Sequence, residues 1–77
     1  KNASLLPSGV TSVKGSFDRG ATVAVHDTAG HLLARGVTLY SSQEITTIAG
    51  LRSKQIGPTL GYVLADEVIH RDDLAML

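Results

Sequence analysis

Cysteine is absent from this chain of 77 residues, so neither a disulfide framework nor a thiolate metal site can form. The sequence also lacks any run of about 18 apolar residues, which excludes a membrane-spanning helix. The apolar stretch near the start, at Leu5 and Leu6, is too short for a signal peptide. These absences favour a cytoplasmic location without membrane contact.

An excess of charge of either sign is also missing. Lys and Arg together number 7, Asp and Glu together number 7, and the formal net charge is zero. The basic residues are spread along the chain, whereas the C-terminal end is locally acidic at Asp66, Glu67, Asp72 and Asp73. Strong non-specific nucleic-acid binding needs a concentrated positive field, which this sequence does not display.

The length is sufficient for one small domain, residues 1–77, with a thin hydrophobic core. The first residue is Lys1 and no initiating Met is present. We therefore expect this domain to be a piece of a longer protein.

The tripeptide His70-Arg71-Asp72 matches the start of a protein-kinase catalytic loop. A protein kinase also needs a glycine-rich phosphate loop, an Asn after this tripeptide and a second metal-binding Asp. None of these follows or precedes it here, and the chain is too short for a nucleotide lobe. The tripeptide therefore does not indicate a kinase active site.

Short apolar runs separated by glycines predict strands in the first half. We expect a strand over Val10–Lys14 and another over Ala21–His26, where Ala21, Val23 and Val25 share one face. A turn over residues 27–30 leads to a returning strand over residues 31–39. Both faces of that strand are apolar near Leu32 and Leu33, which predicts partial barrel closure.

The period changes at Ser41, where Ser41 and Glu44 form a capping-box pattern followed by Ile45, Ile48 and a terminal Gly50. This pattern predicts a helix of about two turns. A second helical stretch is expected over residues 52–62, with Ser53 as its cap and a break or restart that places Pro58 at the first helical position.

Strands are expected again over residues 62–70 and 74–77. The resulting order of strands, short helices and strands predicts a small α+β domain built as a mixed-sheet pseudo-barrel.

Few residues suggest chemistry. His26, Asp27 and His31 flank one turn and could hold zinc, although exposed turn side chains explain them as well. Tyr40 and Tyr62 could stack on a base, or could seal the helices onto the sheet with their hydroxyls at the surface.

Two further stretches have plain structural interpretations beside functional ones. The Pro-Ser-Gly stretch at residues 7–9 could approach a phosphate, and a tight turn is the simpler interpretation. At the C-terminal end, His70 could act as an acid or base, whereas a turn capped by Asp72 or Asp73 and paired with Arg71 requires no substrate site.

A series of short motifs, taken in order and spacing, resembles the C-terminal PUA domain of bacterial glutamate 5-kinases over residues 4–77. Any one of these motifs alone would be weak evidence. The motifs are Ser4-Leu5-Leu6-Pro7 with Gly9-Val10, Phe17-x-Arg19-Gly20, Ala34-Arg35-Gly36, Tyr40-Ser41-Ser42, Ile48-Ala49-Gly50, Leu60-Gly61-Tyr62 and Val68-Ile69-His70-Arg71-Asp72.

The resemblance implies a PUA-like β pseudo-barrel, mainly β with short helices. It implies a parent enzyme that phosphorylates the side-chain carboxylate of glutamate with ATP and magnesium in proline biosynthesis. The catalytic amino-acid-kinase domain of such enzymes is N-terminal and absent from this sequence. Accordingly, the resemblance assigns no catalytic, cofactor-binding or metal-binding residue here, and it implies that the parent's kinase domain and other subunits are partners.

PUA domains elsewhere bind structured RNA through the glycine-containing loop near the first strand and through the last strand. On this chain the resemblance assigns those positions to Ser8, Gly9 and Val10, and to the neighbourhood of Val68 to Arg71, with Arg71 as the charged contact. We therefore expect a regulatory or structural accessory domain, with an RNA-binding module as the alternative.

The sequence departs from the family pattern at two places. Gly57-Pro58 stands where the family continues its second helix with charged residues, so this helix is expected to be short. Asp73 stands where the family often has Asn, which adds negative charge beside the RNA-facing positions.

Overall fold

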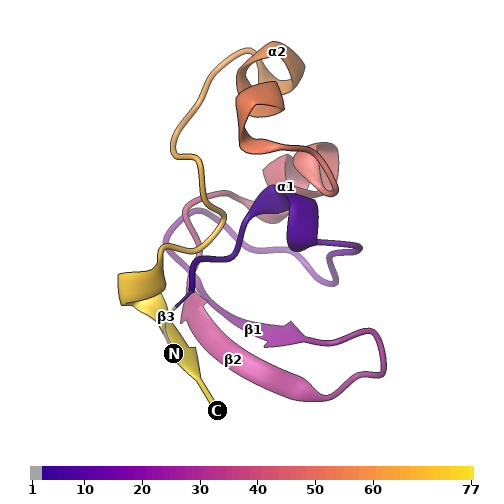
Figure 1. The fold of residues 1–77 in the computed structure, drawn as a ribbon, viewed down its shortest axis with the longest axis vertical. Coiled ribbons are helices and arrows are strands. Elements are labelled where there is room, and N and C mark those ends of the chain that lie inside the picture. The colour runs from indigo at the N-terminus through magenta and orange to yellow at the C-terminus, as the bar shows by residue number, and fades with distance from the viewer. Residues whose placement is uncertain (1–2) are drawn as a thin grey trace.

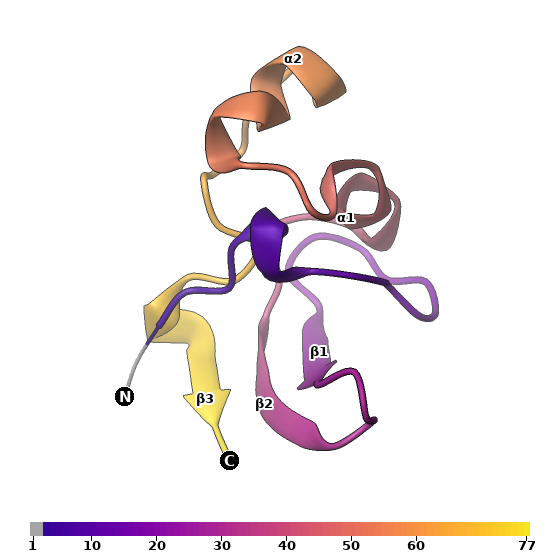
Figure 2. The same ribbon diagram turned by 45° about the vertical axis from the view of Figure 1, so that its right-hand side comes forward.

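The computed structural model describes residues 3–77 and shows a curled antiparallel sheet with short helices gathered at one end of it (Figure 1). Figure 2 shows the same arrangement from another side, with α1 and α2 above the strands. The elements in chain order are η1 (Pro7–Gly9), β1 (Thr22–His26), β2 (Leu32–Val37), α1 (Ser42–Ile48), η2 (Ser53–Gln55), α2 (Ile56–Leu60), η3 (Arg71–Asp73) and β3 (Leu74–Met76), where η marks a 3-10 turn.

The sheet has the order β1-β2-β3, and both strand pairs are antiparallel. The predicted hairpin is confirmed, with Gly30 at a positive φ of 90° in its turn. Burial alternates along β1 as predicted, because Val23 and Val25 are half-buried while their neighbours are exposed. The last predicted strand is also confirmed and forms β3.

In β2 the structure identifies the core face that the sequence left uncertain. Ala34 and Gly36 are buried, whereas Leu33, Arg35 and Val37 point to the exposed face. The sheet bends around this core face, and a short backbone bridge between Leu5 and Ile69 lies beside it. A hydrogen bond of 2.8 Å joins the Leu39 N–H, just after β2, to the Val68 carbonyl. The α+β class agrees with the expectation, whereas the expected mixed sheet is wrong because both strand pairs are antiparallel.

Helix α1 confirms the capping-box prediction. The Ser41 side chain accepts a hydrogen bond of 3.2 Å from the Glu44 N–H, and the Glu44 carboxylate accepts one of 2.8 Å from the Ser41 N–H. The helix ends before Gly50, whose φ of 81° is the left-handed conformation expected just past a helix. Ile45 and Ile48 are buried, so the apolar stripe of the helix faces the core.

The second helical region differs from the prediction in two details. Ser53 does not cap it, because its hydroxyl donates a 2.8 Å hydrogen bond to the Asp66 carbonyl, and the Arg52 N–H is satisfied by the Gln55 side chain at 2.9 Å. Pro58 is the third residue of α2, not the first, and no break occurs there. A proline fits within the first turn because the N–H groups there have no intrahelical partner.

Two predicted strands are wrong. Val10–Lys14 forms no strand, because Val10 and Val13 pack against the core from an irregular segment without a ladder partner. Residues 62–70 form no strand either, apart from Ile69 in its bridge to Leu5. At Leu64 and Ala65 in that segment, one side chain satisfies backbone groups that a neighbouring strand would otherwise pair.

Tyr40 supplies those bonds. It is fully buried at 0% exposure, and its hydroxyl accepts from the N–H groups of Leu64 and Ala65 at 3.1 and 3.0 Å and donates to the Ala65 carbonyl. The prediction of a surface hydroxyl is therefore wrong for Tyr40. The core around this ring lies between the sheet and the helices and contains Tyr40, Ile45, Ile48, Ile56, Val68 and Ile69.

None of the helices within residues 3–77 is long and apolar enough to cross a membrane.

Candidate functional site

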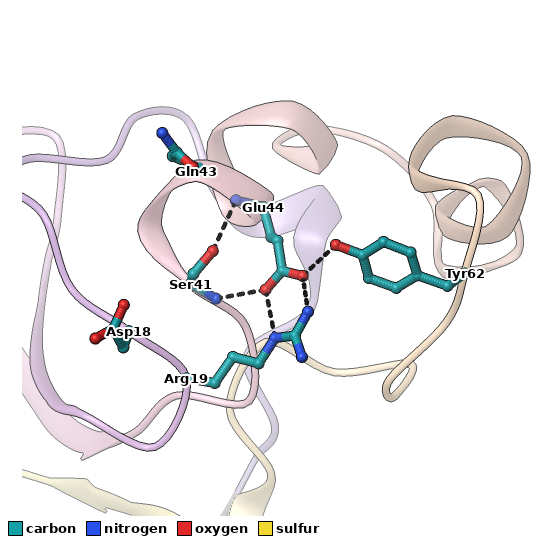
Figure 3. A pocket seen from close by; sticks show the side chains of 6 residues that line it. All are labelled: Asp18, Arg19, Ser41, Gln43, Glu44 and Tyr62. Atoms are coloured by element: carbon teal, nitrogen blue, oxygen red, sulfur yellow. Dashed lines mark hydrogen bonds and ion pairs between the residues drawn. The ribbon is translucent and has the colours of Figure 1, made fainter.

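A connected group of polar side chains joins three parts of the fold (Figure 3). Arg19 comes from the turn before β1, Glu44 from the first turn of α1, and Tyr62 from the segment after α2. The Arg19 guanidinium binds both carboxylate oxygens of Glu44, with Nε to Oε1 at 3.0 Å and Nη2 to Oε2 at 2.6 Å. The Tyr62 hydroxyl donates to Glu44 Oε2, and the guanidinium lies 5.7 Å from the centre of the Tyr62 ring.

Burial divides this cluster into an inner and an outer part. The Glu44 side chain is 8% exposed, whereas that of Arg19 is 54% exposed. The Arg19 hydrogen bond, helped by those from Tyr62 and Ser41, lowers the pKa of Glu44 from 4.5 to about 2 despite its burial. The bond to Glu44 raises the pKa of Tyr62, and the same carboxylate raises the pKa of Arg19.

These protonation states decide what the cluster can do. Glu44 stays ionised at neutral pH, and both of its oxygens already accept hydrogen bonds from Arg19 and from other groups. A general base needs a pKa near the working pH and a free position for the proton. The arrangement is therefore a clamp that holds α1 against the β1 turn and the segment after α2.

A pH dependence of stability follows from the Glu44 pKa. Because the folded-state pKa is depressed, ionised Glu44 contributes stability above about pH 4.5, and this contribution is lost as the pH falls toward about 2. Urea unfolding at a series of pH values from about 6 to about 2, with all other conditions constant, measures this loss of unfolding free energy. A Glu44→Gln variant should show a flatter decline over this window, and an unchanged decline would contradict the assignment. Asp27, whose pKa is lowered chiefly by the His31 N–H, contributes in the same direction in both proteins.

Two shallow, open hollows lie next to the clamp. One is lined by Asp18, Arg19, Ser41, Gln43, Glu44 and Tyr62. The other carries hydroxyl groups and is lined by Gly15, Ser16, Ser42, Gln43, Thr46 and Thr47. Several of these groups already bond within the protein, since Ser42 Oγ accepts from the Phe17 N–H at 3.0 Å and Thr46 Oγ1 donates to the Ser42 carbonyl at 2.9 Å.

The RNA-facing positions implied by the family resemblance fall on two neighbouring segments. Ser8 and Gly9 are exposed on η1, whereas Val10 is half-buried and packs against the core. Arg71 is exposed at the start of η3, and its N–H donates a 3.1 Å hydrogen bond to the Ser4 hydroxyl. The bridge between Leu5 and Ile69 brings the two segments together. Whether Ser8, Gly9, Val10 and Arg71 contact RNA stays a prediction.

Two of the three histidines, His31 and His70, close turns. His31 donates its backbone N–H to Asp27 Oδ1 at 2.8 Å, and its ring Nδ1 lies 3.2 Å from Asp27 Oδ2. Within residues 3–77, no group of three or more His, Asp or Glu side chains is arranged to hold a metal ion. At η3 the His70 ring, not an aspartate, accepts the capping hydrogen bond, from the Asp72 N–H at 3.1 Å. The expectation of an Asp72 or Asp73 cap was therefore wrong.

Sequence reasoning assigned Glu44 only its capping role and did not detect the clamp. Arg19 and Glu44 are 25 positions apart, and Glu44 and Tyr62 are 18 positions apart. No local pattern links them. The one available signal was the Glu44 carboxylate itself, which has acceptor capacity beyond its cap bond.

Comparison of the sequence with those of known proteins gives a matching family and several similar proteins. The sequence model of the family described as "PUA domain" matches residues 1–58. A glutamate 5-kinase of Vibrio vulnificus is 52% identical over 77 residues, which is 100% of this chain and 20% of the relative. A glutamate 5-kinase of Geobacter sulfurreducens is 57% identical over 74 residues, which is 96% of this chain and 20% of the relative. "Glutamate 5-kinase 2" of Pseudoalteromonas translucida is 49% identical over 77 residues, 100% of this chain and 21% of the relative.

The chain thus spans about a fifth of the length of the curated relatives that it matches, and the match falls at their C-terminal end.

Proposed function

The chain belongs to the PUA domain family, and from this premise we propose that it is the accessory C-terminal module of a glutamate 5-kinase and has no catalysis of its own. The observation that carries the proposal is identity of about half to glutamate 5-kinases over at least 96% of the chain. The module would act in the cytoplasm, attached to its parent enzyme. It would help to set the oligomeric assembly or the feedback response of that enzyme.

The chemistry of the parent enzyme is part of the proposal. ATP and magnesium would bind to an amino-acid-kinase domain that precedes this chain, and glutamate would receive the γ-phosphoryl group there as the first committed step of proline biosynthesis. The clamp supports this division of labour between a catalytic kinase domain and a non-catalytic module. The Glu44 carboxylate already accepts hydrogen bonds from Ser41, Arg19 and Tyr62. This geometry stabilises the fold and leaves Glu44 without a free position for proton transfer.

Deletion of these 77 residues from the full-length enzyme tests the proposal. Glutamate-dependent ATP turnover should persist in the truncated enzyme, while its assembly or its inhibition by proline should change. Activity, sedimentation and proline titration measure the three properties side by side with the intact enzyme. If all three were identical in both proteins, the accessory role would be refuted. Turnover of ATP by the 77-residue chain alone would refute the division of labour.

RNA binding is a second candidate, favoured by one local feature. Ser8 and Gly9 are exposed on η1, and Arg71 is exposed at the start of η3. The bridge between Leu5 and Ile69 holds these two segments next to each other. A glycine-containing turn lets backbone N–H groups approach a phosphate, and an arginine supplies positive charge. Asp72 and Asp73 next to Arg71 oppose this attraction.

A binding series with structured RNA at rising salt measures this second function. If η1 and η3 bind phosphate, Arg71→Ala should weaken binding and lower the salt slope by about one. Arg52→Ala is the matched control, because Arg52 is also exposed but lies at the start of η2. Absence of binding at low salt, where phosphate attraction is strongest, would eliminate this candidate.

A further inference from the structure

One face of the sheet is unusually apolar for a surface in contact with water. Antiparallel partners lie on the same face, so the register forms rows across the three strands. One row joins Ala24, Arg35 and Ala75. On one side of it Val37 pairs with Thr22, and on the other the Leu77 N–H donates a 2.9 Å hydrogen bond to the Leu33 carbonyl. We call this surface the outer sheet face, and it consists of Thr22, Ala24, Leu33, Arg35, Val37, Ala75 and Leu77.

The exposure of these side chains is large. Leu33 is 40% exposed, Val37 is 38% exposed and Leu77 is 73% exposed. An antiparallel sheet with one wet face normally places polar residues there. Contiguous exposed apolar side chains more often mark an interaction surface than a free one. Figures 1 and 2 show why the fold itself leaves the face open, since α1 and α2 gather beyond one end of the strands.

We propose that the outer sheet face docks onto the part of the same polypeptide that precedes this domain in the full-length protein. This inference rests on the proposed function, because it needs the chain to be the C-terminal module of a longer enzyme. In the relatives, the matched part is about a fifth of the chain and lies at the C-terminal end, so a much larger body is covalently attached.

The geometry brings that body to the correct side of the domain. Ser4 and Leu5 hydrogen-bond to Arg71 and Ile69, just before β3 begins. The chain at Ser4 and Leu5 therefore lies close to the start of β3, which forms one edge of the outer sheet face. A short covalent connection gives a high effective concentration, so a modest apolar surface is sufficient for stable docking.

Charge indicates the chemistry of the partner surface. Arg35 is the one charged side chain of the outer sheet face, it lies between Ala24 and Ala75, and it makes no ion pair within residues 3–77. An apolar surface with an acidic side chain opposite Arg35 would complement it. A single positive charge among aliphatic groups is a poor match for RNA, whose binding depends on several phosphate contacts.

Thiol labelling of the full-length protein tests the docking. This chain contains no cysteine, so Leu33→Cys and Val37→Cys each introduce a single thiol into the domain. Mass spectrometry of the peptide that contains the new cysteine measures how fast that thiol is labelled. Leu64→Cys is the matched control, because Leu64 is 43% exposed, close to Leu33 at 40%, and lies outside the outer sheet face. Docking predicts labelling at positions 33 and 37 at least about tenfold slower than at position 64 in native protein, with equal rates in urea.

The other outcomes each refute the proposal. Equal native rates at all three positions would show that the face is free. Protection that disappears on dilution would assign the face to a second copy, and protection that requires added RNA would assign it to a nucleic acid. A glutamate kinase assay on the same variants separates the two proposals. Activity without protection refutes docking alone, whereas protection without glutamate kinase activity refutes the proposed function alone.

Discussion

Gly36→Ala is expected to lower the free energy of unfolding by about 3 kcal/mol, which is more than half of the roughly 5 kcal/mol typical of so small a domain. Gly36 is the last but one residue of β2, with its α-carbon against the chain that leads into β3. A methyl group there would meet the Asp73 carbonyl oxygen at 2.6 Å and the Ile69 side chain at 2.8 Å. The backbone oxygen cannot rotate away, so β2 and β3 must separate.

Urea unfolding of the 77-residue chain, followed by circular dichroism, measures this effect. Gly9→Ala is the control, because its added methyl group would meet only a Leu5 methyl carbon at 3.9 Å, an ordinary contact. We expect the free energy of unfolding of Gly9→Ala to lie within about 0.5 kcal/mol of that of the parent chain. A Gly36→Ala protein as stable as the Gly9→Ala protein would show that the pairing of β2 with β3 is looser than described.

Glu44→Ala is expected to cost about 2–3 kcal/mol of unfolding free energy. The substitution removes one half of the capping box, so the Ser41 N–H loses its acceptor. It also removes the acceptor of the Tyr62 hydroxyl and the partner of Arg19. One side chain connects three segments, so its loss should loosen α1, the turn before β1 and the segment after α2 together.

The control for Glu44→Ala is Glu67→Ala, because Glu67 is a half-buried glutamate that makes no hydrogen bond through its side chain within the described residues. Its loss should change the unfolding midpoint little. Hydrogen exchange gives a second measurement, and faster exchange in all three clamped segments is expected only for Glu44→Ala. If exchange accelerated in α1 alone, the clamp would be reduced to a helix cap.

The parts of the fold that the sequence predicts well depend on signals a few residues apart. Helix α1 has its cap at Ser41 and its terminal glycine at Gly50, and both act within the helix itself. The hairpin is similar, since Asp27 and Gly30 determine its turn locally. Family resemblance supplied the rest of the architecture, because its motifs record tertiary contacts that periodicity does not.

The failed predictions share a different physical cause. Residues 62–70 have strand-like composition, but the Tyr40 hydroxyl satisfies the N–H groups of Leu64 and Ala65. Propensity measures how well a side chain suits a pleated surface and does not reveal where backbone partners come from. The clamp was missed for a related reason, since the contact between Arg19 and Tyr62 exists only after the chain has folded.

The bond between the Arg71 N–H and the Ser4 hydroxyl spans 67 positions and, with the Leu5–Ile69 bridge, joins the two ends of the domain. During protein synthesis this closure must wait until Arg71 has left the ribosome. A nascent chain therefore keeps Leu5 without its bridge partner through almost the whole translation of the domain. Messages truncated before the Ile69 codon would yield products that cannot complete the core, and cellular proteases should remove them quickly.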